Sequence, residues 1–144
     1  MSFNERNTTD NLSGIAQLEY VYKEDVASID TDVVLKTGKV WNTIPFTKRS
    51  VQPNTKQKET DGGILYNTLL KFKIPRDEKA FADELVSISS GFILVRETDQ
   101  NGTVRIIGSD SVPARLIFEI SKIGYNGYDC EITCVDISPP LYID

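Results

Sequence analysis

The chain has 144 residues, of which 40% are hydrophobic and 26% are charged, and its formal net charge is −5. A chain of this length folds as one domain around one core, and it needs neither disulfides nor a structural metal for stability. The complete absence of histidine excludes a His-based catalytic triad, a His-containing zinc site and a histidine general base.

Residues 1–13 are polar and have neither helical nor strand periodicity, which predicts a flexible N-terminal arm. They also lack the basic region and the apolar run of a secretory signal peptide. No stretch of the chain approaches 18 consecutive apolar residues, so no membrane-spanning helix is expected. We therefore expect the protein to be made in the cytoplasm.

Residues 14–144 are predicted to form a single β-rich domain. Its first strand is 15–22, where apolar and polar residues alternate, and a second strand follows near 26–29. Two short apolar runs, 33–35 and 40–44, flank a Lys-Thr-Gly-Lys turn, which predicts a hairpin between them.

Residues 46–63 are the longest stretch without the pattern of a strand or a helix. They contain Pro53-Asn54 and the pair Gly62-Gly63, and Val51 is the one aliphatic residue inside the stretch. We therefore predict a long basic loop at about 46–63. Loops beyond about 12–15 residues are uncommon in compact domains and usually carry a function, so this loop is the first candidate for an interaction element. The alternative is a surface loop that has no partner.

The clearest strand covers residues 64–74, where alternation continues over the whole length, and Pro75 ends it. The period then changes to that of a helix of about 12 residues, which Gly91 terminates. Its apolar stripe consists of Phe81, Leu85 and Ile88.

Two Asn-Gly pairs, at 101–102 and 126–127, are the strongest short signals for hairpin turns. The strands that these turns join are 92–97, 103–107, 115–123 and 128–137. Residues 138–144 are predicted to be an extended tail, because prolines do not join the centre of a sheet.

The predicted fold class is mainly β: an antiparallel β-sandwich or partly closed barrel with eight or nine strands and one flanking α-helix. Cys130 and Cys134 would point the same way from one strand, about 13 Å apart. A disulfide needs Cα atoms within about 7 Å, so we interpret both cysteines as buried small hydrophobic residues.

No catalytic, cofactor-binding or metal site is predicted, and we expect a protein that is not an enzyme and has no cofactor. Asp61, Asp110 and Asp136 lie near strand ends or Gly-rich turns and are the least implausible acid–base candidates, but we interpret them as solvated acids in turns. The Gly62-Gly63 pair lacks the context of a phosphate-binding loop and is interpreted as a flexible joint.

The charge distribution is the most informative feature of the sequence. Residues 33–58 hold six basic residues and no acidic residue, whereas the rest of the chain has ten basic and 21 acidic residues. A cationic segment on an anionic body favours one copy reaching onto the next in a ring or stack. Contact with nucleic acid, or lysines that keep an edge strand soluble, are the alternatives. The predicted assembly residues are Lys48, Arg49, Lys56, Lys58, Gly62, Gly63 and Phe3.

Several segments resemble small virion proteins from phages and prophages of Bacteroides-type bacteria. They are Ile15–Val21, the segment around Trp41 and Ile44–Phe46, Phe92–Arg96, Asp99–Gly102, Ile106–Ser109, Asn126–Tyr128 and Ser138–Pro140. The general plan is similar to tail-tube proteins and their relatives at the neck and baseplate. In that wider family hexameric rings stack, a long loop contacts the adjacent ring, and acidic residues line a DNA channel.

The resemblance implies a non-enzymatic virion protein, a tail-tube or tail/neck ring subunit that assembles into hexameric rings around the DNA channel. Its expected partners are further copies of itself, neighbouring tail or neck proteins and passing DNA that is not specifically bound, with no membrane. Its expected location is the tail or neck of the virion. Tube, terminator, connector and baseplate roles stay open.

A second hypothesis is a ligand- or carbohydrate-binding β-sandwich module, such as a receptor-binding or baseplate accessory protein. In that case exposed tyrosines would stack on sugars. The candidates are Tyr20, Tyr22, Tyr66, Tyr125 and Tyr128.

Overall fold

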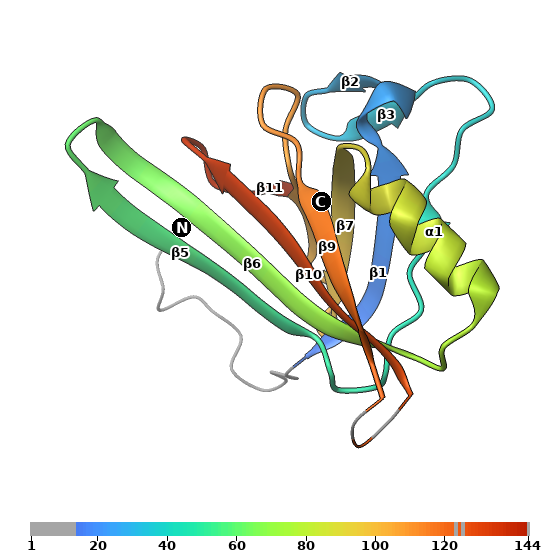
Figure 1. The fold of residues 1–144 in the computed structure, drawn as a ribbon. Coiled ribbons are helices and arrows are strands. Elements are labelled where there is room, and N and C mark those ends of the chain that lie inside the picture. The colour runs from blue at the N-terminus through green and yellow to red at the C-terminus, as the bar shows by residue number, and fades with distance from the viewer. Residues whose placement is uncertain (1–13, 123, 125, 144) are drawn as a thin grey trace.

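The structure, a computed structural model, describes residues 14–122, 124 and 126–143 (Figure 1). Its elements in chain order are β1 Ile15–Tyr22, the 3₁₀ turn η2 Lys23–Asp25, β2 Val26–Ile29, β3 Val33–Leu35, β4 Asn42–Thr43, β5 Gln52–Thr60, β6 Gly63–Pro75, α1 Lys79–Ser89, β7 Ile93–Asp99, β8 Val104–Ile107, β9 Arg115–Ser121, β10 Gly127–Asp136 and β11 Leu141–Ile143. The fold is mainly β, as predicted, and the sheets do not close into a barrel.

Two antiparallel sheets pack face to face around the main core. One has the strand order β11-β8-β7-β1-β4, and the other has the order β5-β6-β10-β9. The inward residues of both sheets are apolar and almost completely inaccessible to solvent, including Leu18, Leu70, Phe72, Ile93, Leu116 and Ile132. The alternation predicted for β6 and β10 is therefore the alternation of a half-buried sheet.

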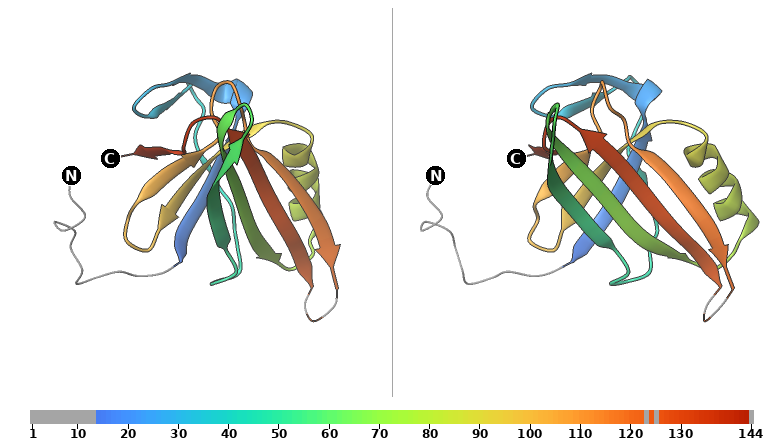
Figure 2. Two further views of the ribbon diagram at one scale, coloured as in Figure 1. Left: turned by 90° about the vertical axis from the view of Figure 1, so that its left-hand side faces the viewer. Right: turned by 60° about the vertical axis from the view of Figure 1, so that its left-hand side comes forward.

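A second, smaller core lies on the other face of the five-stranded sheet. The β2–β3 ribbon covers that face, and Figure 2 shows it at one end of the sandwich. Its buried members are Val21, Val33, Leu94 and Ile106. Because β1 and β7 are covered on both faces, Ile93, Leu94 and Val95 form one continuous buried run.

The helix α1 closes one side of the sandwich beside β9, and Leu85 and Ile88 point into the main core as the helical period predicts. Two polar contacts also hold α1 to β1. The Tyr20 hydroxyl donates to Glu84, and the hydroxyls of Tyr22 and Ser87 lie 2.8 Å apart. Burial, together with the Glu84 carboxylate, raises the pKa of Tyr20 far above its usual range.

The prediction of a long loop at 46–63 is wrong for half of that stretch. Residues Gln52–Thr60 form β5, which pairs with β6 along its full length, from Gln52 opposite Lys71 to Thr60 opposite Gly63. The hydrophobic pattern does not indicate this strand, because it is an edge strand with few apolar residues. Its backbone pairing with β6, rather than burial of side chains, defines it.

A further prediction about local pairing is wrong. The runs 33–35 and 40–44 do not form a hairpin, because β3 pairs with β2 while β4 pairs with β1 in another sheet. The predicted extended tail contains one more strand, because Leu141–Ile143 forms β11 at the edge of the sheet beside β8. Both prolines precede β11 and cost it no hydrogen bond.

One polar cluster joins the end of β6 to the β9–β10 end of the sheet. Asp77 accepts hydrogen bonds from Lys122 and, at 2.6 Å, from the Tyr128 hydroxyl. The bonds from Lys122 and Tyr128 lower the pKa of Asp77. Burial, together with Asp77, raises the pKa of Tyr128 to about 12.

We predict that Asp77→Asn removes an acid-sensitive part of the stability. A carboxyl whose folded pKa is depressed stabilises the fold above its unfolded pKa, and this contribution is lost as pH falls through the folded pKa. Urea unfolding of both proteins from neutral to acidic pH measures the difference. The wild type is expected to be more stable near neutral pH, and the two curves should converge in acid; a gap that does not change with pH would contradict this assignment.

Candidate assembly surface

The β5–β6 hairpin extends beyond the rest of its sheet, as the green arm in Figure 1 shows. β10 pairs with β6 only from Tyr66 to Pro75, so residues 63–65 and the β5 residues opposite them have no strand on the β10 side. Asp61 and Gly62 form the turn, and Gly63 has φ +126°. A side chain there would be strained, so a glycine is required.

The predicted assembly residues that the structure describes lie in three places: the outer face of β5, the turn before β5 and the tip of the β5–β6 hairpin. Lys56 and Lys58 lie on β5 and alternate with Thr55, which faces the other sheet, so both lysines belong to the outer face. Lys48 and Arg49 lie in the turn before β5, at the other end of that strand, where Thr47 N donates to Lys73 O at 2.7 Å. Gly62 and Gly63 are at the hairpin tip, and Phe3 lies outside the described residues.

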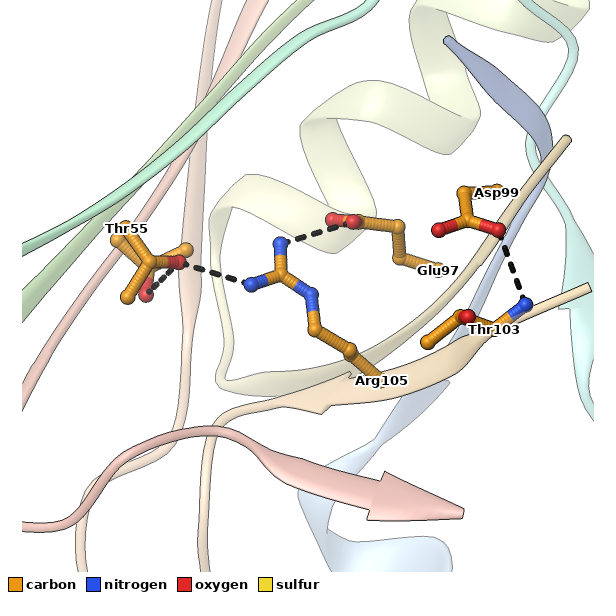
Figure 3. Close-up of polar contacts among 6 residues, drawn as sticks. Thr55, Glu97, Asp99, Thr103 and Arg105 are labelled. Atoms are coloured by element: carbon orange, nitrogen blue, oxygen red, sulfur yellow. Dashed lines mark hydrogen bonds and ion pairs between the residues drawn. The ribbon is translucent and has the colours of Figure 1, made fainter. Parts of the chain in front are cut away.

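A buried ionic cluster fastens the hairpin to the opposite sheet (Figure 3). Arg105 of β8 donates from Nη2 to Glu97 Oε1 of β7 at 2.8 Å, and from Nη1 to Thr55 Oγ1 of β5 at 3.3 Å. The Thr55 hydroxyl lies 3.2 Å from that of Thr68 on β6. One guanidinium therefore links three strands from two sheets.

The electrostatics of this cluster follow from its burial. The side chains of Glu97 and Arg105 are 4% and 18% exposed. Burial opposes the charge on Arg105, but the charge and hydrogen bond of Glu97, together with Tyr142, outweigh it, so the pKa of Arg105 is raised. Glu97 Oε2 is buried and accepts no hydrogen bond from the residues that the structure describes. The pair therefore contributes more to orientation than to stability.

The two outer strands of the four-stranded sheet leave their far edges unpaired within the described part of the chain. β5 carries Pro53 and lysines, which are common protections of an edge. β9 carries the exposed charged residues Arg115 and Glu119, and α1 packs beside it. Ile117 and Ile120 nevertheless project from its opposite faces and are 60% and 53% exposed. Exposed apolar residues on an edge strand are candidates for contact with another chain.

The outer face of this sheet carries charges of both signs. Lys71 lies 3.8 Å from Glu131, and Lys73 lies 4.0 Å from Asp129, across the β6–β10 ladder. Exposed pairs of this kind contribute little stability. Their effect is to keep the centre of the face close to neutral, unlike the acidic lining that the resemblance implies.

A groove of about 350 Å³ lies between the hairpin and the C-terminal strand. Its walls are mostly apolar, with Tyr66 and Tyr142 among them, and Asp30 and Asp136 contribute carboxylates. Neither aspartate has a cationic partner among the described residues; Asp136 Oδ1 accepts from the backbone N–H of Ile137 at 2.7 Å. The groove therefore combines an apolar lining with uncompensated negative charge.

The other sequence candidates are not brought together. Asp61 is in the hairpin turn and Asp110 pairs with Lys23 at 2.8 Å, so neither joins Asp136 in the groove. Burial raises the pKa of Cys130 to about 12 and that of Cys134 to about 11. Both cysteines are buried and unpaired, as predicted. Within the described ranges no three His, Cys, Asp or Glu residues are placed to hold a metal.

The tyrosines predicted for the sugar-binding alternative do not form a platform. Tyr20 and Tyr128 are 4% and 0% exposed and belong to the main core. Tyr22 packs against that core, and Tyr20, Tyr22 and Tyr66 line three different hollows of the surface rather than one. Tyr125 lies outside the described residues.

Comparisons do not assign a family. No family model, curated protein or solved structure matches the chain. No helix in the described part of the chain is long and apolar enough to cross a membrane. Function must therefore be argued from the surfaces of the fold.

We predict that Arg105→Met is strongly destabilising, by roughly 3 kcal/mol or more, because it leaves Glu97 buried without its cation. The double variant Glu97→Leu/Arg105→Met should recover most of this loss, because it removes both charges. Denaturant unfolding of the four proteins in the cycle gives the coupling free energy. Additive effects of the two substitutions would show that the ion pair is not coupled in the folded protein.

Proposed function

We propose that this chain is a non-enzymatic structural subunit of a bacteriophage virion, a tail-tube or tail/neck ring protein that assembles with copies of itself. The observation that carries the proposal is the four-stranded sheet whose two outer strands have no further strand partner in the described part of the chain, β5 with exposed lysines and β9 with exposed isoleucines. Ring formation, hexameric symmetry and location in the virion are taken from the resemblance of the sequence.

The strand directions favour repetition of this sheet. Each neighbouring pair in the order β5-β6-β10-β9 is antiparallel, so β5 and β9 run in opposite directions. If a second copy is placed beside the first in the same orientation, its β5 is antiparallel to the first copy's β9. An antiparallel ladder thus continues from copy to copy without a break.

Charge favours contact between unlike edges over contact between like edges. Two β5 strands side by side would bring Lys56 and Lys58 of both copies together, and like charges across a ladder are destabilising. Contact of β5 with β9 avoids this repulsion and covers Ile117. Contacts between unlike surfaces form rings when the rotation closes.

The centre of the outer face is close to electrically neutral, which is compatible with DNA that passes along it without being bound. If the sheets of a ring face inward, the Lys71–Glu131 and Lys73–Asp129 pairs present balanced charge to the channel. Specific or tight binding of nucleic acid needs an uncompensated basic face. The proposal therefore includes passage of DNA without retention.

The direct test is the mass and shape of the purified chain at high concentration, measured by light scattering after size exclusion and by electron microscopy. Closed rings or tubes of one repeating subunit are expected. A protein that remains monomeric throughout, in the presence and absence of neighbouring virion proteins, would contradict the proposal.

The apolar edge can be tested by Ile117→Lys/Ile120→Lys. Both side chains are more than half exposed, so folding is expected to persist, while ring formation should be lost because β9 then repels the basic β5 edge. Val34→Lys/Val40→Lys is the matched control, since it adds the same charge at residues that are 54% and 69% exposed and lie outside this sheet. Equal assembly of the β9 variant and the control would exclude β9 as the contact.

A further inference from the structure

We infer that the groove lined by Tyr66, Tyr142, Asp30 and Asp136 receives the basic turn, residues 47–50, of a second copy of this chain. The contact would join rings end to end, so it rests on the proposed function. The resemblance implies that a long loop makes the axial contact, and the inference narrows this contact to the turn before β5 and names the groove that receives it.

The groove has the chemistry that long basic side chains require. Arginine and lysine bury an apolar stem and keep a charged end near polar groups. The groove offers apolar walls for the stem, Tyr66 and Tyr142 in its lining, and two carboxylates for the charged end. Both carboxylates lack a cationic partner within the described part of the chain. An incoming lysine or arginine therefore does not have to displace another cation from them.

The basic turn has the matching properties. Lys48 and Arg49 are exposed and form no ion pair with the residues that the structure describes. The turn itself is fixed, since Ser50 N donates to Thr47 O at 2.9 Å and Ser50 Oγ accepts from Lys73 N at 3.1 Å. Two cations are thereby presented on a short backbone that loses little freedom on docking.

The two surfaces lie at opposite ends of the sandwich, which makes the contact head to tail. The turn is bonded to Lys73, near the Pro75 end of β6, whereas the groove contains Tyr66, near the Gly63 end. Seven residues of extended strand separate these positions by about 23 Å. A chain cannot satisfy its own groove across that distance, but identical copies in a stack satisfy each other.

Complementary charge reversal tests this pairing in the full chain. The first variant, Lys48→Glu/Arg49→Asp, reverses the turn; aspartate is chosen at 49 because φ there is +64°, a region that Asp tolerates. The second variant, Asp30→Arg/Asp136→Asn, reverses the groove, and asparagine keeps the oxygen that accepts from Ile137 N.

The expected result is that each variant forms single rings and neither stacks alone. A mixture of the two should stack, because each turn then meets a groove of opposite charge, and one chain carrying all four substitutions should stack as well. Electron microscopy of particle length measures this. Salt at about 1 M should separate wild-type stacks into rings, because charges are then screened within about 3 Å.

The outcomes separate this inference from the proposed function. Stacks of wild-type length from either variant, or a mixture that does not stack, would overturn the pairing while rings remain. Absence of rings from the wild type would overturn the proposed function itself. Lys36→Glu/Lys79→Glu is the control, since it changes the net charge as much as the first variant at exposed residues outside the turn, and it should stack normally.

Discussion

The ladder between β6 and β10 is the constraint on which the other features depend. It joins residues from Tyr66 opposite Asp136 to Pro75 opposite Gly127, and it fixes which side chains face the core. Because β6 extends beyond β10, the hairpin with β5 projects from the sheet. Because each central strand is already paired on both sides, the sheet can grow only at β5 and β9. The exposed edges are thus a consequence of the topology.

The buried pair of Glu97 and Arg105 gives that topology a defined orientation. Apolar contacts between sheets are not directional, whereas a guanidinium that contacts a carboxylate on one sheet and Thr55 on the other fixes their relative position. Desolvation of both charges offsets much of the attraction, so the pair is a poor source of net stability. Its physical effect is to hold the hairpin in one direction relative to the five-stranded sheet.

The sequence predicts those elements in which buried and exposed side chains follow one regular period. Residues 64–74 and the helix with Leu85 and Ile88 are recognisable because apolar residues follow one period. β5 has no such period, since an edge strand is defined by its partner's backbone. Glu97 and Arg105 also escape detection, because a buried ion pair looks like two exposed polar residues until the opposite sheet is placed. The cluster of basic residues is visible in the sequence, but its division between turn and strand depends on the pairing of β5 with β6.

Amide hydrogen exchange at increasing protein concentration tests the central claim most directly, namely that copies associate through the edges of the four-stranded sheet. Outward-pointing amides of β5 and β9 are expected to become protected as the protein assembles, while amides of β7, which is already paired on both sides, keep the same exchange rate. Assembly that leaves the exchange of β5 and β9 unchanged would contradict the account.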